Sequence, residues 1–227
     1  MAVRTDRMTT FIYTTYTHAA PEQIWRGLTD SAMTKRYWRH QKAGPKTFRS
    51  DWTKGSTWDL EHKQVGLVVS DPAQVILESD PYRRLSYTWH SFTPRWAAEV
   101  GMDEATAKAW RAESRSKVTF DMQDVGRGVV KLTVTHDGFP PGSRVLQAIS
   151  EGWPAVLSSL KTLLETGTVL PARRLRPANA GPSKAGKNEP APEQIIRVFA
   201  DTSASLSVKA PNRQLGLYGW VRRAHGV

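Results

Sequence analysis

Residues 143–167 read SRVLQAISEGWPAVLSSLKTLLETG, and apolar side chains recur in this stretch every three or four positions. That spacing predicts one broad apolar stripe along a helix. Ser143 suits the N-cap of such a helix, and Gly167 suits its C-terminal stop. At 1.5 Å per residue the helix would be about 35 Å long, enough to cross a β-sheet.

The chain before this helix is rich in strand-like segments separated by turn signals. The six segments are GSTWDLEH (55–62), GLVVSD (66–71), AQVILES (73–79), RLSYTWHSF (84–92), SKVTFDMQ (116–123) and GVVKLTVTH (128–136). In the last of them Val130, Leu132, Val134 and His136 share one face, which is typical of an antiparallel sheet with one covered side. We interpret His62, which is next to Lys63, as a turn residue.

Four further segments precede the sheet or interrupt it. MTTFIYTTYT (8–17) favours a strand, and APEQIWRGLTD (20–30) and SAMTKRYW (31–38) favour short helices. TPRWAAEVGMDEATAKAWRAES (93–114) is longer than a hairpin turn requires. We interpret it as a helical insertion at about 95–114, placed over the mouth of a pocket.

The composition changes near Gly167. Residues 1–167 are predicted to form one domain. Residues 168–227 are dense in Pro, Ala, Gly and Lys, and residues 171–227 carry ten basic and three acidic side chains. Such a composition predicts a basic, largely disordered tail. The charge of this tail is only weak support for binding to nucleic acid or to an anionic surface.

Several function classes lack their sequence signals. The 227 residues contain no cysteine, which excludes disulfides and thiolate ligands, and no apolar run long enough to span a membrane. The motifs HExxH, GxSxG, GxGxxG and GxxxxGK[ST] are absent, and the six histidines are scattered. We therefore expect no metal and no cofactor. The N-terminus has no secretory signal pattern, which predicts a cytoplasmic protein.

The order of these elements resembles the helix-grip, or START-like (SRPBCC, Bet v 1-like), superfamily. APEQIWRGLTD, DPYRRLSYTWHSF, SKVTFDMQ, KLTVTHDGF and EGWPAVLSSLKTLLETG are similar to the branch named after the activator of Hsp90 ATPase, the AHSA1-like domains. The resemblance covers about residues 8–167. It implies an α+β fold, in which a curved antiparallel sheet wraps around the long C-terminal helix and two short helices follow the first strand. It also implies a hydrophobic cavity between sheet and helix.

Aromatic side chains supply candidate walls for that cavity, since small-molecule sites combine apolar rings with a few polar groups. Eight of the nine tryptophans lie in the first 170 residues. The predicted ligand-binding residues are Trp58, Leu60, Tyr87, Trp89, Phe120, His136 and Trp153. For any single tryptophan, filling the core is the more common role. The phase of His90 predicts that it faces away from Tyr87 and Trp89.

His136 is the best candidate for chemistry, as a hydrogen-bond partner of a ligand or as a general acid or base. Three functions stay open. We favour a non-enzymatic protein that binds a small hydrophobic or amphipathic ligand. The alternatives are a polyketide cyclase or dehydratase-like enzyme using the same pocket, and a protein that interacts with an Hsp90-type chaperone ATPase. The ligand and the oligomeric state are beyond what the sequence indicates.

Overall fold

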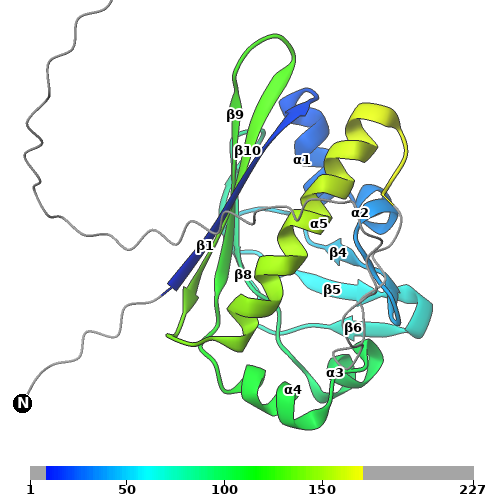
Figure 1. Cartoon of the computed structure of the whole chain (residues 1–227), viewed down its shortest axis with the longest axis vertical. Coiled ribbons are helices and arrows are strands. Elements are labelled where there is room, and N and C mark those ends of the chain that lie inside the picture. Colours follow the sequence, from blue (N-terminus) through cyan, green and yellow to red (C-terminus); the bar gives the residue numbers. More distant parts are fainter. Residues whose placement is uncertain (1–8, 171–227) are drawn as a thin grey trace, which may run out of the picture. The chain divides into compact units, whose positions relative to one another are not determined.

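The computed structural model describes residues 9–170, and a five-stranded antiparallel sheet forms their largest element. Its strand order is β1-β10-β9-β8-β7. The bounds are Thr9–His18 (β1), Ile76–Asp80 (β7), Arg84–Thr88 (β8), Lys117–Asp124 (β9) and Val129–Phe139 (β10). The long helix α5 (Arg144–Thr166) follows and runs across one side of this sheet (Figure 1). The α+β helix-grip architecture expected from the sequence is confirmed.

The six predicted strand segments all contain strands, but these divide between two sheets. β5 (Asp59–His62) and β6 (Leu67–Val69) pair with each other and with β4 (Thr47–Arg49) in a three-stranded sheet. A 3-10 helix, Lys63–Val65, joins β5 to β6. A single bridge between Thr57 and Val75 ties this region to the start of β7. Three short strands, β2 (Arg39–His40), β3 (Gly44–Pro45) and β4, have no counterpart in the sequence prediction.

The short helices form where their capping residues predict. α1 (Pro21–Thr29) begins with proline at its first position, and Asp30 caps α2 (Ser31–Tyr37) by accepting from the Ala32 amide. The segment between β8 and β9 holds two helices, α3 (Pro94–Val100) and α4 (Glu104–Arg111). We call α3, α4 and their flanks, residues 93–114, the helical insertion.

Helix α5 packs its apolar stripe into the core. Its buried positions include Val145, Trp153, Leu157, Leu160 and Leu163. Gly27 of α1 lies so close that an added Cβ would approach Leu160 Cδ1 to 2.8 Å, so a larger residue would force the Leu160 side chain to shift.

The predicted basic tail lies outside the described residues, except for its first three positions, and stays a prediction. Among the described helices, none is long and apolar enough to cross a membrane.

Candidate functional site

The interior between the sheets and α5 is filled by interlocking aromatic rings. Trp58 lies 5.7 Å from Phe48 and 5.2 Å from Tyr87, measured between ring centroids. Trp153 of α5 lies 5.5 Å from Phe120. Centroid separations of this size are typical of packed aromatic pairs, so these rings stabilise the core by contact with one another.

All seven predicted ligand-binding residues are buried in this packed core. Trp58, Leu60, Tyr87, Phe120, His136 and Trp153 are at most 4% exposed, and Trp89, which follows the end of β8, is 7% exposed and lies 5.6 Å from the Trp153 ring. The structure therefore brings all seven together, and their role as ligand contacts stays a prediction.

His136 is a buried histidine with both ring nitrogens bonded. Its Nδ1 accepts a hydrogen bond of 3.0 Å from Trp153 Nε1, and its Nε2 lies 2.9 Å from Ser116 Oγ. An indole N–H can only donate, so Nδ1 is unprotonated and Nε2 carries the ring hydrogen. His136 thus donates to the Ser116 hydroxyl. Burial lowers the pKa of His136 to about 3, so the ring is neutral.

The direction of these bonds determines which part of the Ser116 hydroxyl remains free for a ligand. Its oxygen accepts from His136, and no other hydrogen bond of this hydroxyl occurs among the described residues. Its own hydrogen is therefore available to an acceptor. We call Trp153, His136 and Ser116 the donor relay.

Ser116 and Trp89 both line a cavity of about 370 Å³ at the end of the core. Its walls come from three places: the loop after β8 up to the first residue of α3, the end of α4 with the chain that leads to β9, and the first turn of α5. The aromatic lining residues are Trp89, His90, Phe92 and Trp110. The charged ones are Arg111, Glu113 and Arg115.

His90 was expected to face away from Trp89, and this prediction is wrong. β8 ends at Thr88, so the alternation of a strand no longer applies to His90. Its ring turns inward, 4% exposed, 5.1 Å from the Trp89 ring and 5.0 Å from the Phe92 ring. The expected turn residue His62 is likewise an inward-facing end of β5 and is fully buried.

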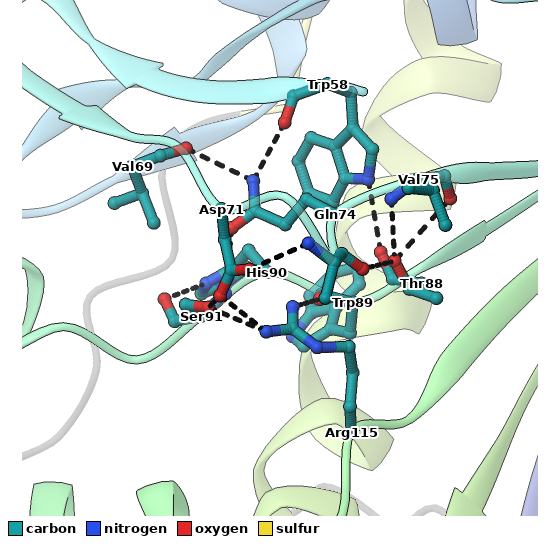
Figure 2. A network of polar contacts seen from close by, with 11 residues as sticks. Trp58, Val69, Asp71, Gln74, Val75, Thr88, Trp89, His90, Ser91 and Arg115 are labelled. Carbon is teal, nitrogen blue, oxygen red and sulfur yellow. Dashed lines mark hydrogen bonds and ion pairs between the residues drawn. The ribbon is translucent and has the colours of Figure 1, made fainter. Parts of the chain in front are cut away.

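A polar network holds the loop after β8 in place (Figure 2). Arg115 donates to the Trp89 carbonyl at 2.7 Å and to Asp71 Oδ2 at 2.7 Å. Asp71 also accepts from the Ser91 hydroxyl, and the buried Gln74 accepts from the Ser91 amide at 3.0 Å. The bonds from Ser91, from the Ala73 amide and from Arg115 lower the pKa of Asp71.

Glu113 fastens the other end of the helical insertion to α5. Its Oε1 accepts from the amides of Arg144 at 2.8 Å and Val145 at 3.3 Å, and its Oε2 accepts a 2.5 Å bond from the Ser143 hydroxyl. These amides belong to the first turn of α5, where a carboxylate is stabilised by otherwise unpaired N–H groups.

Each charged side chain in the cavity wall is therefore already engaged within the protein. Arg115 pairs with Asp71, Glu113 caps α5, and Arg111 pairs with Glu104. Within residues 9–170, no group of three or more His, Cys, Asp or Glu side chains could hold a metal ion. The arrangement favours a neutral ligand with an apolar body and one hydrogen-bond acceptor.

The sequence did not single out Ser116, Arg115, Phe92 or Trp110. Trp110 lies in α4, and the other three lie where strand-like segments end or begin beside the helical insertion, so sequence spacing did not show that they meet. The available signal was the unusual length of the insertion together with its aromatic residues, Trp96 and Trp110.

The model of one protein family matches residues 18–165, that of Activator of Hsp90 ATPase homolog 1-like protein. No curated protein matches the sequence. Among solved structures, a Mesorhizobium loti protein shares 23% identity at a TM-score of 0.50, covering 68% of this chain and 96% of its own. A Staphylococcus saprophyticus protein shares 18% identity at 0.50, covering 72% and 97%. At these identities the likeness establishes the fold alone.

Proposed function

The chain belongs to the family of Activator of Hsp90 ATPase homolog 1-like proteins. Because a fold does not by itself fix a function, we propose the function from the site: the protein binds a small amphipathic ligand. The ligand has an aromatic or other apolar body and a neutral hydrogen-bond acceptor such as a carbonyl. It occupies the cavity beneath the helical insertion.

The observation that carries this proposal is the donor relay ending at the cavity wall. A cavity of about 370 Å³ lies within the range of small-molecule sites, and its aromatic rings suit an apolar body. The free hydroxyl hydrogen of Ser116 would fix the orientation of the ligand's acceptor. Since the lining charges are paired with other protein groups, a charged ligand would gain little there.

Fluorescence titration with prodan tests the proposal, because this probe joins a naphthalene body to a neutral ketone. We expect saturable binding to the full chain and a shifted emission maximum. Ser116→Ala removes one hydrogen bond and should weaken binding about fivefold to tenfold. Ser114→Ala is the matched control, since Ser114 also lines the cavity but is not part of the relay.

Two results would count against the proposal. One is the absence of saturable prodan binding, together with the absence of any ligand retained from a metabolite extract in native mass spectrometry. The other is equal prodan affinity for the two serine variants, which would show that the relay does not contact the ligand.

An enzymatic role for His136 has less support. A general base needs a free lone pair within reach of a substrate proton, and the Nδ1 lone pair of His136 is occupied by Trp153. Binding to an Hsp90-type chaperone is suggested by the family's description. A pull-down with that chaperone and an assay of its ATPase activity would test this alternative.

A further inference from the structure

The wall of the cavity at the helical insertion includes a buried histidine, His90. The residue is 4% exposed, and its ring is surrounded by other aromatic rings. The His90 ring lies 5.1 Å from Trp89, 5.0 Å from Phe92 and 5.0 Å from Trp96, measured between centroids. These contacts hold the imidazole in one place, so the direction of its two nitrogens matters for the cavity.

The hydrogen bond of Nδ1 determines which tautomer His90 adopts. Nδ1 lies 3.0 Å from the backbone carbonyl of Ser91 (Figure 2), and a carbonyl oxygen only accepts, so Nδ1 carries the ring hydrogen. Burial lowers the pKa of His90 well below its usual value, and the charge of Lys46 adds to this effect, whereas the Ser91 carbonyl opposes it. The ring is therefore neutral, and Nε2 has a lone pair that can accept a hydrogen bond.

No group within residues 9–170 donates a hydrogen bond to Nε2 of His90. The Trp96 indole contacts the same ring, but its Nε1 is fully enclosed without any acceptor, so it does not use this lone pair. Nε2 is not among the unpartnered side-chain nitrogens that the described residues enclose completely. Because His90 lines the cavity, a ligand there can approach Nε2.

Ser116 and His90 offer opposite halves of a hydrogen-bond pattern to the same cavity. Ser116 has a free hydroxyl hydrogen, and His90 has a free lone pair. The Trp89 ring contacts both parts of this pattern: it lies 5.1 Å from the His90 ring and 4.8 Å from the ring of His136, which bonds to Ser116. A ligand whose apolar body lies against Trp89 can therefore meet both polar groups.

We propose that His90 selects ligands that carry a hydrogen-bond donor, such as a phenolic hydroxyl or an amide N–H, in addition to the acceptor that meets Ser116. This inference rests on the function proposed for the cavity, and it narrows the ligand to a neutral aromatic carbonyl compound with a second, donating group. Solvent satisfies Nε2 until a ligand displaces it. A ligand without a donor then leaves Nε2 unpaired inside the cavity, and this cost produces the selectivity.

Matched hydroxyl and methoxyl compounds test the proposal on the full chain. The probes are 6-propionyl-2-naphthol and 7-propionyl-2-naphthol, which keep the naphthalene and the ketone of prodan, and the methyl ether of each. The two isomers point the hydroxyl in different directions. Calorimetric titration at about pH 6 keeps the naphthols neutral. We expect at least one naphthol to bind about tenfold more tightly than its own methyl ether, as one hydrogen bond to an otherwise unpaired acceptor allows.

His90→Phe is the decisive variant. Phenylalanine keeps a ring against Trp89 and Phe92 but has no acceptor, so the preference for the naphthol should fall below about twofold. A preference caused only by the size of the methoxyl group would persist in this variant. Ser116→Ala is the matched control. It should weaken the binding of a naphthol and of its methyl ether alike and leave the preference unchanged, since Ser116 meets the ketone that both compounds share.

A second measurement uses the wild type alone and serves if His90→Phe does not fold. In ¹⁵N-labelled protein, the unprotonated Nε2 of His90 has its own nitrogen resonance, which is assigned through its couplings to the ring protons. The preferred naphthol should shift this resonance because it donates to Nε2, and the methyl ether should shift it much less.

Failure of this inference and failure of the proposed function give different results. If all four compounds bind but neither naphthol is favoured by about fivefold or more, His90 is not a selecting residue, and the function of the cavity stands. A preference that persists in His90→Phe, or an Nε2 resonance that the naphthol leaves in place, would also overturn the inference. If neither prodan nor any of the four compounds binds, the function proposed for the cavity fails, and the role of His90 fails with it.

Discussion

At the scale of single residues, His136 shows how burial decides what a histidine can do. The alternation of Val130, Leu132 and Val134 along β10 predicts that the His136 side chain faces the core. Its partners do not follow from the sequence, because Ser116 lies just before β9 and Trp153 lies in α5. Their bonds turn a candidate base into a neutral donor that orients a serine.

The lowered pKa of His136 makes a prediction for stability against pH. In the unfolded chain the ring takes up a proton near its ordinary pKa of 6.5, whereas in the folded chain it does so only near about 3. Between these values the unfolded state binds more protons, so the free energy of unfolding falls as the pH falls.

Replacement by His136→Gln should remove this contribution. We expect the pH dependence of the unfolding free energy to become shallower by up to about 1.4 kcal/mol per pH unit in that window. Denaturant unfolding at a series of pH values measures it. Since His62 and His90 remain, some slope should persist. An unchanged slope would show that His136 titrates normally in the folded protein.

At the scale of elements, the long periodic segments were predictable, whereas among the described strands of two or three residues only β6 (Leu67–Val69) falls in a predicted segment. The stripe in residues 143–167 locates α5 (Arg144–Thr166) to within one residue at each end. β2, β3 and β4 span two or three residues each, too few to show an alternation. His62 and His90 were misplaced for a related reason: they lie at or beyond strand ends, where local periodicity no longer reports on side-chain direction.

Glu113 attaches the helical insertion to α5. Glu113→Gln keeps the size of the side chain and removes the charge that three donors share. We expect a loss of about 1–2 kcal/mol in unfolding free energy, together with faster hydrogen exchange in α4 and the first turn of α5.

Glu104→Gln is the comparison for Glu113→Gln. Glu104 lies in the same insertion and pairs with Arg111, but its side chain is 71% exposed. An exposed ion pair contributes little, so this variant should lose less than about 0.5 kcal/mol. Equal losses in the two variants, or unchanged exchange in Glu113→Gln, would show that Glu113 does not hold the insertion in place.

At the scale of the whole molecule, the fold could be predicted, but the place of the cavity could not. The sequence indicated a sheet, a covering helix and aromatic residues between them. Whether such rings line a hollow or fill it depends on how they interlock, and Trp58, Tyr87, Phe120 and Trp153 interlock closely. A cavity of about 370 Å³ lies at the helical insertion, with Trp89 and Trp110 in its wall, and the expected cavity between sheet and helix stays a prediction.

The most direct measurement is ¹⁹F NMR of the full chain labelled with 5-fluorotryptophan, recorded with and without prodan. Single Trp→Phe variants assign the resonances. If the cavity beneath the insertion binds the ligand, prodan should shift the signals of Trp89 and Trp110 and leave those of the core residues Trp58 and Trp38 in place. Shifts at Trp58 and Trp38 with Trp110 unmoved would contradict this account and return the binding site to the space between sheet and helix.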